Sequence, residues 1–522
     1  MKLESLIAGE WTPGSGEGRA LVNPVTGETV AHADATGLDF AQAMEFARGT
    51  GGAALRAMSF AERGKLLRAV ADVLVANRDK YEEIARINSG NTKVDASIDI
   101  DGGIGTLKFY ARIGQSLGDA TTILEAGEDQ LAKEPVFFSR HLWTTRPGVA
   151  LQINAFNFPS WGLWEKIAVA TIAGAPSMAK PATATAWLSH EMMRDVIAAG
   201  IVPAGVFNMV CGGGEGLLDA VGPMDSIAFT GSADTGALVR SHANVSATGV
   251  RVTIEADSVN ATILGPDVTP DSALFDLAVR EVSKALSVKA GQLCTNIRRV
   301  LVPRAHLDAF TESVAASVSR FKTGDPVDEA VRVGPLVNKR QQQDAFDGIA
   351  KLSAEARIVT GGDIPADLDS GLAGKGAFVA PTLLSCAEPH AAKAVHAIEV
   401  FGPCATAMPH DGIADAADLA IHGGGSLALS LFTNDAQTRL HAASLLGPWH
   451  GRIMMVDEET GRNHTGHSIV MPQCTHGGPG RAGGGEELGG LRGMRLHMQR
   501  SAIQGSHKAF EALSGGAAEA AL

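Results

Sequence analysis

Short apolar runs recur every 20–30 residues from residue 148 onward, and this spacing limits the chain to a small set of folds. Segments with helical patterning, such as WLSHEMMRDVIAAG (187–200), lie between the runs. Strands that alternate with helices in this way form βαβ units around a parallel sheet. We therefore predict an α/β fold whose first sheet contains GVALQI (148–153), APSMAK (175–180), GVFNMV (205–210), DSIAFT (225–230) and RVTIEA (251–256).

A second α/β region is expected over residues 258–450. It opens with a helical pattern, DSALFDLAVREVSKALSVKAGQL (271–293), which places Cys294 at the end of a helix. The N-terminal part is typical of short strands followed by long helices, and Ser59 with Glu62 has the spacing of a capping box.

Composition excludes several classes of function. The net charge of −13 argues against a nucleic-acid partner, which requires a basic surface. The longest apolar stretches are too short to cross a membrane, and the N-terminus lacks the apolar segment of a signal peptide. Five scattered cysteines without a CxxC pair indicate neither a disulfide framework nor a zinc site, so we expect a soluble protein of the reducing cytoplasm.

Ligands of parallel sheets bind beyond the carboxyl ends of the strands. Asn157, Lys180, the loop TGSADTG (230–236) and Glu255 all lie at or just past such ends. Gly231 permits a close backbone approach, and the helix that follows presents N–H groups to an anion, so Gly231 and Ser232 are candidates for contact with a phosphate. Lys180 could hold ribose or phosphate oxygens, although a solvated lysine at a strand end is also common.

Three of the residues form a set suited to covalent catalysis. Cys294 is a candidate nucleophile, Glu255 a candidate general base whose pKa burial is expected to raise, and Asn157 a candidate donor to an oxyanion. Each also has a plainer interpretation, as a buried apolar thiol, a carboxylate that caps a loop, and an asparagine in a turn. Together the three favour the catalytic interpretation.

The glycine-rich tail contains a literal GxGxxG, GPGRAG (478–483), but it follows no strand and opens no helix. We therefore interpret it as a closely packed or flexible surface loop rather than a dinucleotide-binding loop. His464 and His467 lack a third ligand motif, so we predict no metal site.

Six motifs occur in the order and rough spacing of the aldehyde dehydrogenase superfamily, which the chain resembles over nearly its whole length. The resemblance implies that Cys294 is the nucleophile, Glu255 the base and Asn157 the oxyanion donor. It also implies that a nicotinamide cofactor contacts Ile153, Lys180, Thr183, Gly231, Ser232, Glu399 and Phe401. The motifs are NAFNFP (154–159), MAKPATATA (178–186), FTGSADTG (229–236), TIEADSVNA (253–261), GQLCTN (291–296) and EVFGP (399–403).

The chain departs from the family pattern in three places. Ala155-Phe156 replaces the usual Pro-Trp, and Ala256-Asp257-Ser258 replaces the usual Leu-Gly-Gly. Many members that prefer NAD have a glutamate where this chain has Thr183. A carboxylate there would repel a 2′-phosphate, so Thr183 favours NADP, with NAD as the alternative.

These departures resemble a subgroup found in the degradation of aromatic compounds. It contains the dehydrogenase halves of ring-cleavage proteins for phenylacetate, which are often fused to a hydratase, and stand-alone enzymes of benzoyl-CoA degradation. The 522 residues include no hydratase domain, which favours the second type. The resemblance then implies oxidation of a CoA-linked substrate, 3,4-dehydroadipyl-CoA semialdehyde, to the acid. A semialdehyde of the phenylacetyl-CoA pathway, acylation of free CoA, and a non-catalytic member with the same fold are the alternatives.

The resemblance also implies the domain organisation. We expect a Rossmann-like cofactor-binding domain (1–129 and 149–257), a catalytic domain (258–450) and a small β oligomerisation element (130–148 and 475–508). Subunits of the family pair through a projecting hairpin and a C-terminal strand, here near GMRLHMQRSAI (493–503), so a homodimer or homotetramer is expected.

Overall fold

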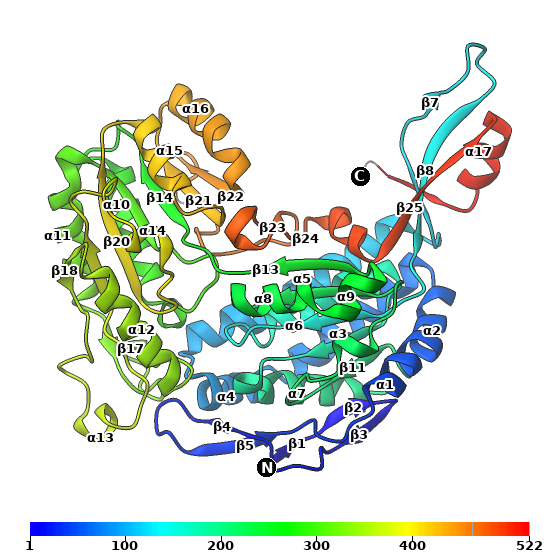
Figure 1. Ribbon diagram of the computed structural model, residues 1–522, viewed down its shortest axis with the longest axis horizontal. Helices are drawn as coiled ribbons and strands as arrows, with labels where there is room; N and C mark the ends of the chain where they lie inside the picture. The colour runs from blue at the N-terminus through cyan, green and yellow to red at the C-terminus, as the bar shows by residue number, and fades with distance from the viewer. Residues whose placement is uncertain (462, 521–522) are drawn as a thin grey trace.

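A computed structural model describes residues 1–461 and 463–520 of the chain (Figure 1). Within these residues, two seven-stranded sheets lie in the two halves of the molecule, and a smaller sheet projects from one end. The N-terminal part has the expected order: strands β1 (Lys2–Leu3) to β5 (Thr29–Ala33) precede the long helices α3 (Phe60–Ala76), α4 (Arg78–Ser89) and α5 (Lys93–Leu117). Ser59 and Glu62 form the predicted capping box of α3.

The first sheet confirms the five predicted strands. They are β9 (Ala150–Ile153), β10 (Ser177–Lys180), β11 (Phe207–Met209), β12 (Ser226–Thr230) and β13 (Arg251–Glu255), all parallel, in the order β13-β12-β9-β10-β11. Antiparallel β2 (Ser5–Ile7) and β3 (Glu10–Thr12) extend the edge beside β11. Because the chain runs from β9 to one side through β10 and to the other side through β12, the topology switches between β9 and β12. A crevice for a ligand is expected at this point.

The second sheet has the order β18-β19-β20-β15-β14-β21-β22 and is parallel except at β18 (Arg357–Thr360). Its other strands are β14 (Ala261–Leu264), β15 (Arg299–Pro303), β19 (Thr382–Ser385), β20 (Cys404–His410), β21 (Ser426–Phe432) and β22 (His450–Val456). The helix predicted to run to residue 293 was wrong at its C-terminal end. Helix α10 covers Ala273–Ala285, and the backbone then turns through three positive φ angles, at Lys289, Ala290 and Gly291.

The small sheet consists of β25 (Met498–Gly505), β8 (Phe138–Thr145), β6 (Ile123–Glu125) and β26 (Ala518–Ala520), with β7 (Asp129–Gln130) also paired to β8. In Figure 1, β7 and β8 form an arm that extends away from the main body, with α17 (His507–Ser514) beside it. The sheet includes β6 and β26, which lie outside the ranges expected for the oligomerisation element. The division of the chain into domains stays a prediction.

The glycine-rich tail packs closely against β13. Its elements are β23 (Thr475–Gly477), a 3₁₀ turn over Gly480–Ala482 and β24 (Glu486–Leu488). The expectation that GPGRAG follows no strand was wrong, because β23 directly precedes it. GPGRAG nevertheless leads through the 3₁₀ turn to another strand and opens no α-helix. Ala256 donates its backbone N–H to Ala482 O at 3.0 Å, and Gly485 donates to Ile254 O at 3.1 Å. A Cβ atom at Gly485 would collide with the Thr253 side chain and the Ile254 backbone, so this close approach requires glycine.

No helix among the described residues combines the length and the apolar character that a membrane crossing requires.

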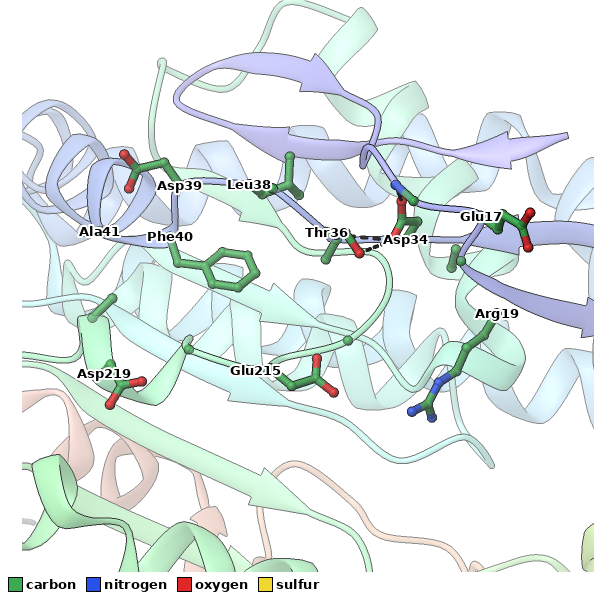
Figure 2. Close-up of a pocket in the computed structure, with 18 residues that line it drawn as sticks. Glu17, Arg19, Asp34, Thr36, Leu38, Asp39, Phe40, Ala41, Glu215 and Asp219 are labelled. Carbon is green, nitrogen blue, oxygen red and sulfur yellow. Dashed lines mark hydrogen bonds between the residues drawn. The ribbon is translucent and has the colours of Figure 1, made fainter.

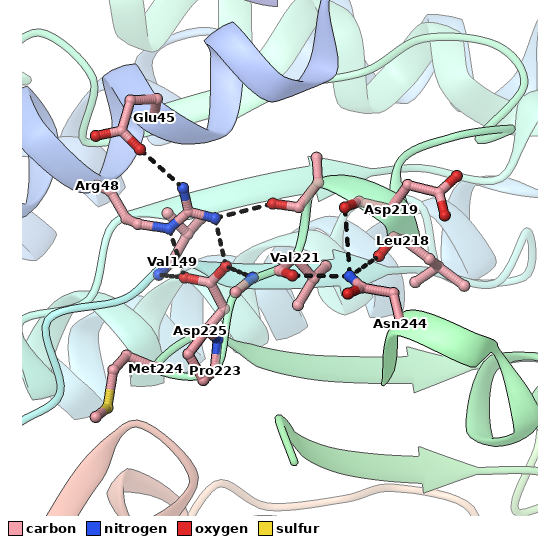
Figure 3. Close-up of polar contacts among 12 residues, drawn as sticks. Glu45, Arg48, Val149, Leu218, Asp219, Val221, Pro223, Met224, Asp225 and Asn244 are labelled. Carbon is pink, nitrogen blue, oxygen red and sulfur yellow. Dashed lines mark hydrogen bonds and ion pairs between the residues drawn. The ribbon is translucent and has the colours of Figure 1, made fainter. Parts of the chain in front are cut away.

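An ion pair between a partly exposed arginine and a buried aspartate anchors the N-terminal helices to the turn before β12 (Figure 3). Arg48, which follows α1 (Phe40–Phe46), donates from Nε and Nη2 to the two carboxylate oxygens of Asp225 at 3.0 and 2.6 Å. The Asp225 side chain is fully buried and also accepts the backbone N–H groups of Val149 and Gly222, both at 2.7 Å. Asp225 therefore fixes the starts of β9 and β12, whose other ends carry candidate site residues.

We predict that Arg48→Met lowers the free energy of unfolding by about 3–5 kcal/mol, because it leaves the buried carboxylate of Asp225 without its cation. Chemical denaturation followed by tryptophan fluorescence measures this loss. Arg68→Met is the matched control, since Arg68 pairs with Asp72 on the surface with both side chains more than half exposed, and it should cost no more than about 1 kcal/mol. Equal losses for the two variants would contradict the anchoring role of Arg48.

Candidate functional site

One cavity of about 560 Å³ brings together all ten candidate site residues. It opens at the switch point of the first sheet and reaches the second sheet at Glu399 and Phe401. A narrower cavity continues from it past Cys294 toward α6 (Trp161–Ala173). The ten candidates, all among the residues that line the larger cavity, are Ile153, Asn157, Lys180, Thr183, Gly231, Ser232, Glu255, Cys294, Glu399 and Phe401.

The loop that carries Cys294 is held by its backbone. Lys289 and Ala290 adopt φ angles of 49°, an uncommon conformation for residues with a Cβ atom. Gly291 has a φ of 71° and lies so close to the carbonyl of Gly402 that a Cβ atom would collide with it. Arg298 is buried beneath the loop and donates to Gly402 O at 2.8 Å and to Gly291 O at 3.0 Å. Arg298 therefore holds the loop in place.

The segment between β13 and β14 joins the two sheets at the same point. Asn260 donates from its amide to Cys294 O at 2.8 Å and to Asn296 O at 2.9 Å. Ser258 donates its backbone N–H to Glu399 Oε2 at 3.0 Å. Because Glu255 ends β13 only a few residues earlier, the base and the nucleophile are positioned by one short stretch of chain.

Glu255 and Cys294 share their immediate surroundings with His476 of the glycine-rich tail. The Cys294 sulfur, a Glu255 carboxylate oxygen and a His476 ring nitrogen all lie within 4.8 Å of one another. His476 Nε2 lies 3.0 Å from Glu255 Oε2, and both side chains are buried. Thiolate, imidazole and carboxylate are also the ligand types of zinc, but the charge pairing of Glu255 with His476 accounts for this arrangement without a metal.

The expected rise in the pKa of Glu255 was wrong. Burial alone would raise it, but the charge of His476, its hydrogen bond and the charge of Lys166 outweigh burial and lower the pKa to about 2. Burial alone would lower the pKa of His476, because it disfavours the positive charge, but Glu255 and the neighbouring carboxylates outweigh burial and raise this pKa. Glu255 is therefore ionised throughout the neutral range. Burial and the negative charge of Glu255 raise the pKa of the Cys294 thiol, so the thiol carries its proton at rest.

A second charged group lies behind Glu255, on α6 and β24. Lys166 lies 2.9 Å from Glu487 Oε2 and 3.6 Å from Glu165 Oε1, and it donates to Thr230 Oγ1 at 3.0 Å. Burial raises the pKa of Glu165 to about 7. A carboxyl with this pKa can take up and release a proton near neutral pH.

Asn157 offers an unused donor to the reacting atoms. Its side chain is only 7% exposed, and its Nδ2 has no hydrogen-bond partner within the described part of the chain. Buried amide groups are rarely left unpaired, because the lost hydrogen bond to water costs free energy. The amide lies on the wall of both cavities, so a substrate oxygen that enters beside Cys294 would satisfy it.

The cavity wall fits a polar cofactor. Glu399 Oε1 and both polar side-chain atoms of Asn154 are buried and make no hydrogen bond among residues 1–461 and 463–520, although Arg298 Nη2 lies 3.6 Å from Glu399 Oε1. Burial raises the pKa of Glu399 to about 7. Phe401 packs edge-on against Phe156 at 5.6 Å, so its ring forms a fixed apolar wall.

The start of α8 (Ala233–Ser241) is the predicted phosphate loop. Ser232 caps the helix by accepting the N–H of Thr235. Asp257, one of the departures from the family pattern, accepts the N–H of Ala233 at 3.0 Å. One of the N–H groups expected to face a phosphate is therefore already occupied. Gly231 and Ser232 still line the cavity beside Lys180.

Four residues near the site were missed from the sequence. His476 and Glu487 lie in the glycine-rich tail, which we had assigned no catalytic part. Lys166 lies in the middle of an apolar helical pattern. A lysine at such a position, away from the end of the helix, is itself a signal of a buried charge. Arg19 lines the cofactor cavity from an N-terminal strand, and nothing in its local pattern indicates this position.

Comparison with known proteins identifies the family. The aldehyde dehydrogenase family model matches residues 11–494. The 3,4-dehydroadipyl-CoA semialdehyde dehydrogenase of Aromatoleum evansii is 50% identical over 482 residues, which cover 92% of this chain and 93% of that protein.

Crystal structures share the fold at lower identity. Betaine aldehyde dehydrogenase from Staphylococcus aureus, solved in complex with NAD⁺, has a TM-score of 0.81 and 23% identity, covering 97% of this chain and 95% of that one. PnpE from Pseudomonas sp. WBC-3 has a TM-score of 0.82 and 22% identity, covering 97% and 98%. The predicted fold class is thereby confirmed. The chain belongs to the aldehyde dehydrogenase family and is an oxidoreductase that acts on aldehydes.

Proposed function

We propose that the protein oxidises a CoA-linked semialdehyde, 3,4-dehydroadipyl-CoA semialdehyde, to its carboxylic acid with NADP as the hydride acceptor. The arrangement of Cys294, Glu255 and Asn157 around one cavity is the observation that carries the reaction type. The substrate rests on the relative of that name, which is 50% identical over nearly the full length of both chains. The specific roles of the ten residues are part of this proposal.

The reaction begins at the sulfur of Cys294. Cys294 passes its proton to the ionised carboxylate of Glu255, with which the thiol shares a hydrogen bond, and Glu255 hands the proton on to the charged groups behind it before water attacks. The sulfur forms a bond to the aldehyde carbon, whose oxygen becomes an oxyanion. The Asn157 amide and the backbone N–H of Cys294 donate to this oxyanion. A nicotinamide held in the cavity beside Phe401 and Glu399 would supply the hydride acceptor. Loss of the hydride from the carbon would leave a thioester on Cys294.

Water then attacks the thioester and passes a proton to Glu255. The carbon–sulfur bond breaks, the acid leaves and the sulfur of Cys294 is regenerated. Glu255 is ionised at neutral pH and therefore ready to accept the proton, and the hydrogen-bonded charges around it can carry the proton onward. Glu165, with a pKa of about 7, is the group in this network best matched to exchange it.

Thr183 and Lys180 support NADP over NAD. Both line the cavity, and Thr183 donates to Gly212 O at 3.3 Å without placing a carboxylate beside the ribose. NAD stays the alternative cofactor. The semialdehyde of the phenylacetyl-CoA pathway stays the alternative substrate.

Acylation of free CoA is the alternative reaction. It would need free CoA rather than water to resolve the thioester, and hence no base at residue 255. The position of the Glu255 carboxylate within 4.8 Å of the Cys294 sulfur favours hydrolysis.

We also propose a cytoplasmic location and a homodimer or homotetramer. All five cysteines are free thiols, which suits a reducing compartment. The projecting arm carries exposed apolar side chains, including Val136 and Phe137 at 65% and 40% exposure, which a partner subunit would cover.

The reaction is tested by following NADPH formation with free and CoA-linked semialdehydes, with and without free CoA. We expect turnover of the CoA-linked substrate without free CoA. Asn157→Ala should lower kcat about 100–1,000-fold by removing one oxyanion donor. Glu255→Gln should lower it about 100–10,000-fold. Strict dependence on free CoA would contradict hydrolysis, and full activity of Cys294→Ala would contradict the nucleophile.

We predict that His476→Gln moves the acidic limb of the pH–rate profile to higher pH. The pKa of Glu255 is held low by the charge of His476 against the effect of burial. Without that charge, burial raises the pKa, so the carboxylate is protonated and unable to act as a base at a higher pH than before. Steady-state rates measured between about pH 5 and pH 9 give the pH–rate profiles of the unmodified enzyme and of His476→Gln. His441→Gln, an exposed histidine, is the control and should leave the profile unchanged. Coincident profiles for His476→Gln and the unmodified enzyme would contradict the role of the ion pair.

The oligomer is tested with a charge on the arm. Val136→Asp should dissociate the assembly, because it places a carboxylate in the apolar contact, and light scattering after gel filtration reports the mass. Val327→Asp is the matched control, since Val327 is 62% exposed but lies outside the arm. An unchanged mass for Val136→Asp, with Val327→Asp also unchanged, would argue that subunits pair elsewhere.

A further inference from the structure

Arg19 lies where two hollows of the structure meet. It begins β4 (Arg19–Val22) and lines the cofactor cavity together with Lys180 and Thr183. It also lines a second, open hollow of about 940 Å³, formed by the N-terminal strands and the loop that contains Glu215 (Figure 2). In Figure 2 the side chain of Arg19 extends from its strand toward the side of the hollow where Glu215 lies.

The guanidinium of Arg19 has no polar partner among the described residues. Arg19 is exposed, and its guanidinium donates no hydrogen bond and forms no ion pair within the part of the chain that the structure describes. An unpaired guanidinium on a cavity wall is available to a ligand that carries negative charge.

Charge links Arg19 to Lys180. Burial lowers the pKa of Lys180, and the positive charge of Arg19 lowers it further, whereas the carboxylate of Glu215 acts in the opposite direction. Both side chains line the same cavity, so their positive charges face one site for an anion. Gly214, next to Glu215, lies against the Lys180 side chain, since a Cβ atom there would be 3.4 Å from Lys180 Cε.

We propose that Arg19 and Lys180 together grip the 2′-phosphate of NADP, and that Arg19 is the residue that makes the enzyme choose NADP over NAD. The inference rests on the proposed position of the cofactor in this cavity. A dianionic phosphate between the two cations removes their repulsion, and the planar guanidinium can donate two parallel hydrogen bonds to it. Thr183 leaves room for the phosphate. Glu215 is the competing anion that the phosphate must outweigh.

Binding of nucleotide fragments tests this without turnover. Adenosine 2′,5′-bisphosphate carries the 2′-phosphate, and 5′-AMP lacks it, so isothermal titration calorimetry with both isolates the contribution of that group. Arg19→Gln should weaken binding of the bisphosphate roughly 10- to 100-fold and leave 5′-AMP unchanged, as expected for the loss of charge-assisted hydrogen bonds. Arg19→Lys should retain part of the affinity, because a point charge remains without the paired donors.

A second variant makes the opposite prediction. Glu215→Gln should tighten binding of the bisphosphate and leave 5′-AMP unchanged, since it removes the competing carboxylate. Arg68→Gln, a surface arginine far along the chain on α3, is the control for a lost positive charge and should change neither affinity.

The outcomes separate the two proposals. If the unmodified protein binds both fragments equally, the preference for NADP is wrong and the inference falls with it. If it prefers the bisphosphate but Arg19→Gln and Glu215→Gln leave that preference unchanged, the preference stands and the role of Arg19 is wrong.

Discussion

The buried ion pair between Glu255 and His476 determines the charge state of the catalytic centre. Each partner comes from a different part of the chain, Glu255 from the end of β13 and His476 from the glycine-rich tail. Two buried ionisable groups would each shift toward the neutral form if they were alone. Paired at 3.0 Å they keep opposite charges, so a carboxylate remains ionised beside a thiol that keeps its proton.

This pairing explains why the tail is rich in glycine. The tail must approach the backbone of β13 closely enough to bring His476 beside Glu255, and a side chain at Gly485 would block that approach. The same requirement for contact appears at Gly291, whose close packing on Gly402 fixes the loop before Cys294. Glycine at both positions lets the backbones come close together, although glycine loses more conformational freedom on folding than other residues. Backbone contacts between segments distant in sequence thus bring together His476, Glu255 and Cys294.

The parts of the fold that depend on local patterns were predictable. The five apolar runs gave the five strands of the first sheet, and the rule that ligands bind at carboxyl strand ends selected Asn157, Lys180 and Glu255 before any geometry was known. The parts that depend on long-range contacts were not. The pKa of Glu255 was expected to rise because its sequence neighbours show only burial, whereas the charge that reverses the shift comes from a residue more than two hundred positions away. The end of α10 was missed because the helical pattern of the sequence continues beyond Ala285. The backbone nevertheless leaves the helix there, and the loop that follows is held by contacts with Arg298 and Gly402, which are distant in the sequence or not visible in its pattern. Arg19 could not be assigned, since it reaches the cavity through the packing of β4 against the distant turn Thr183–Thr185.

The central claim is that Cys294 carries the substrate as a thioester, which water activated by Glu255 then removes. It is tested most directly by mass spectrometry of Glu255→Gln after a single turnover with NADP and the CoA-linked semialdehyde. The account predicts one equivalent of NADPH and an acyl group on the peptide that contains Cys294, which should disappear slowly. An unmodified Cys294 peptide after NADPH has formed, or an acyl group on another cysteine, would contradict it.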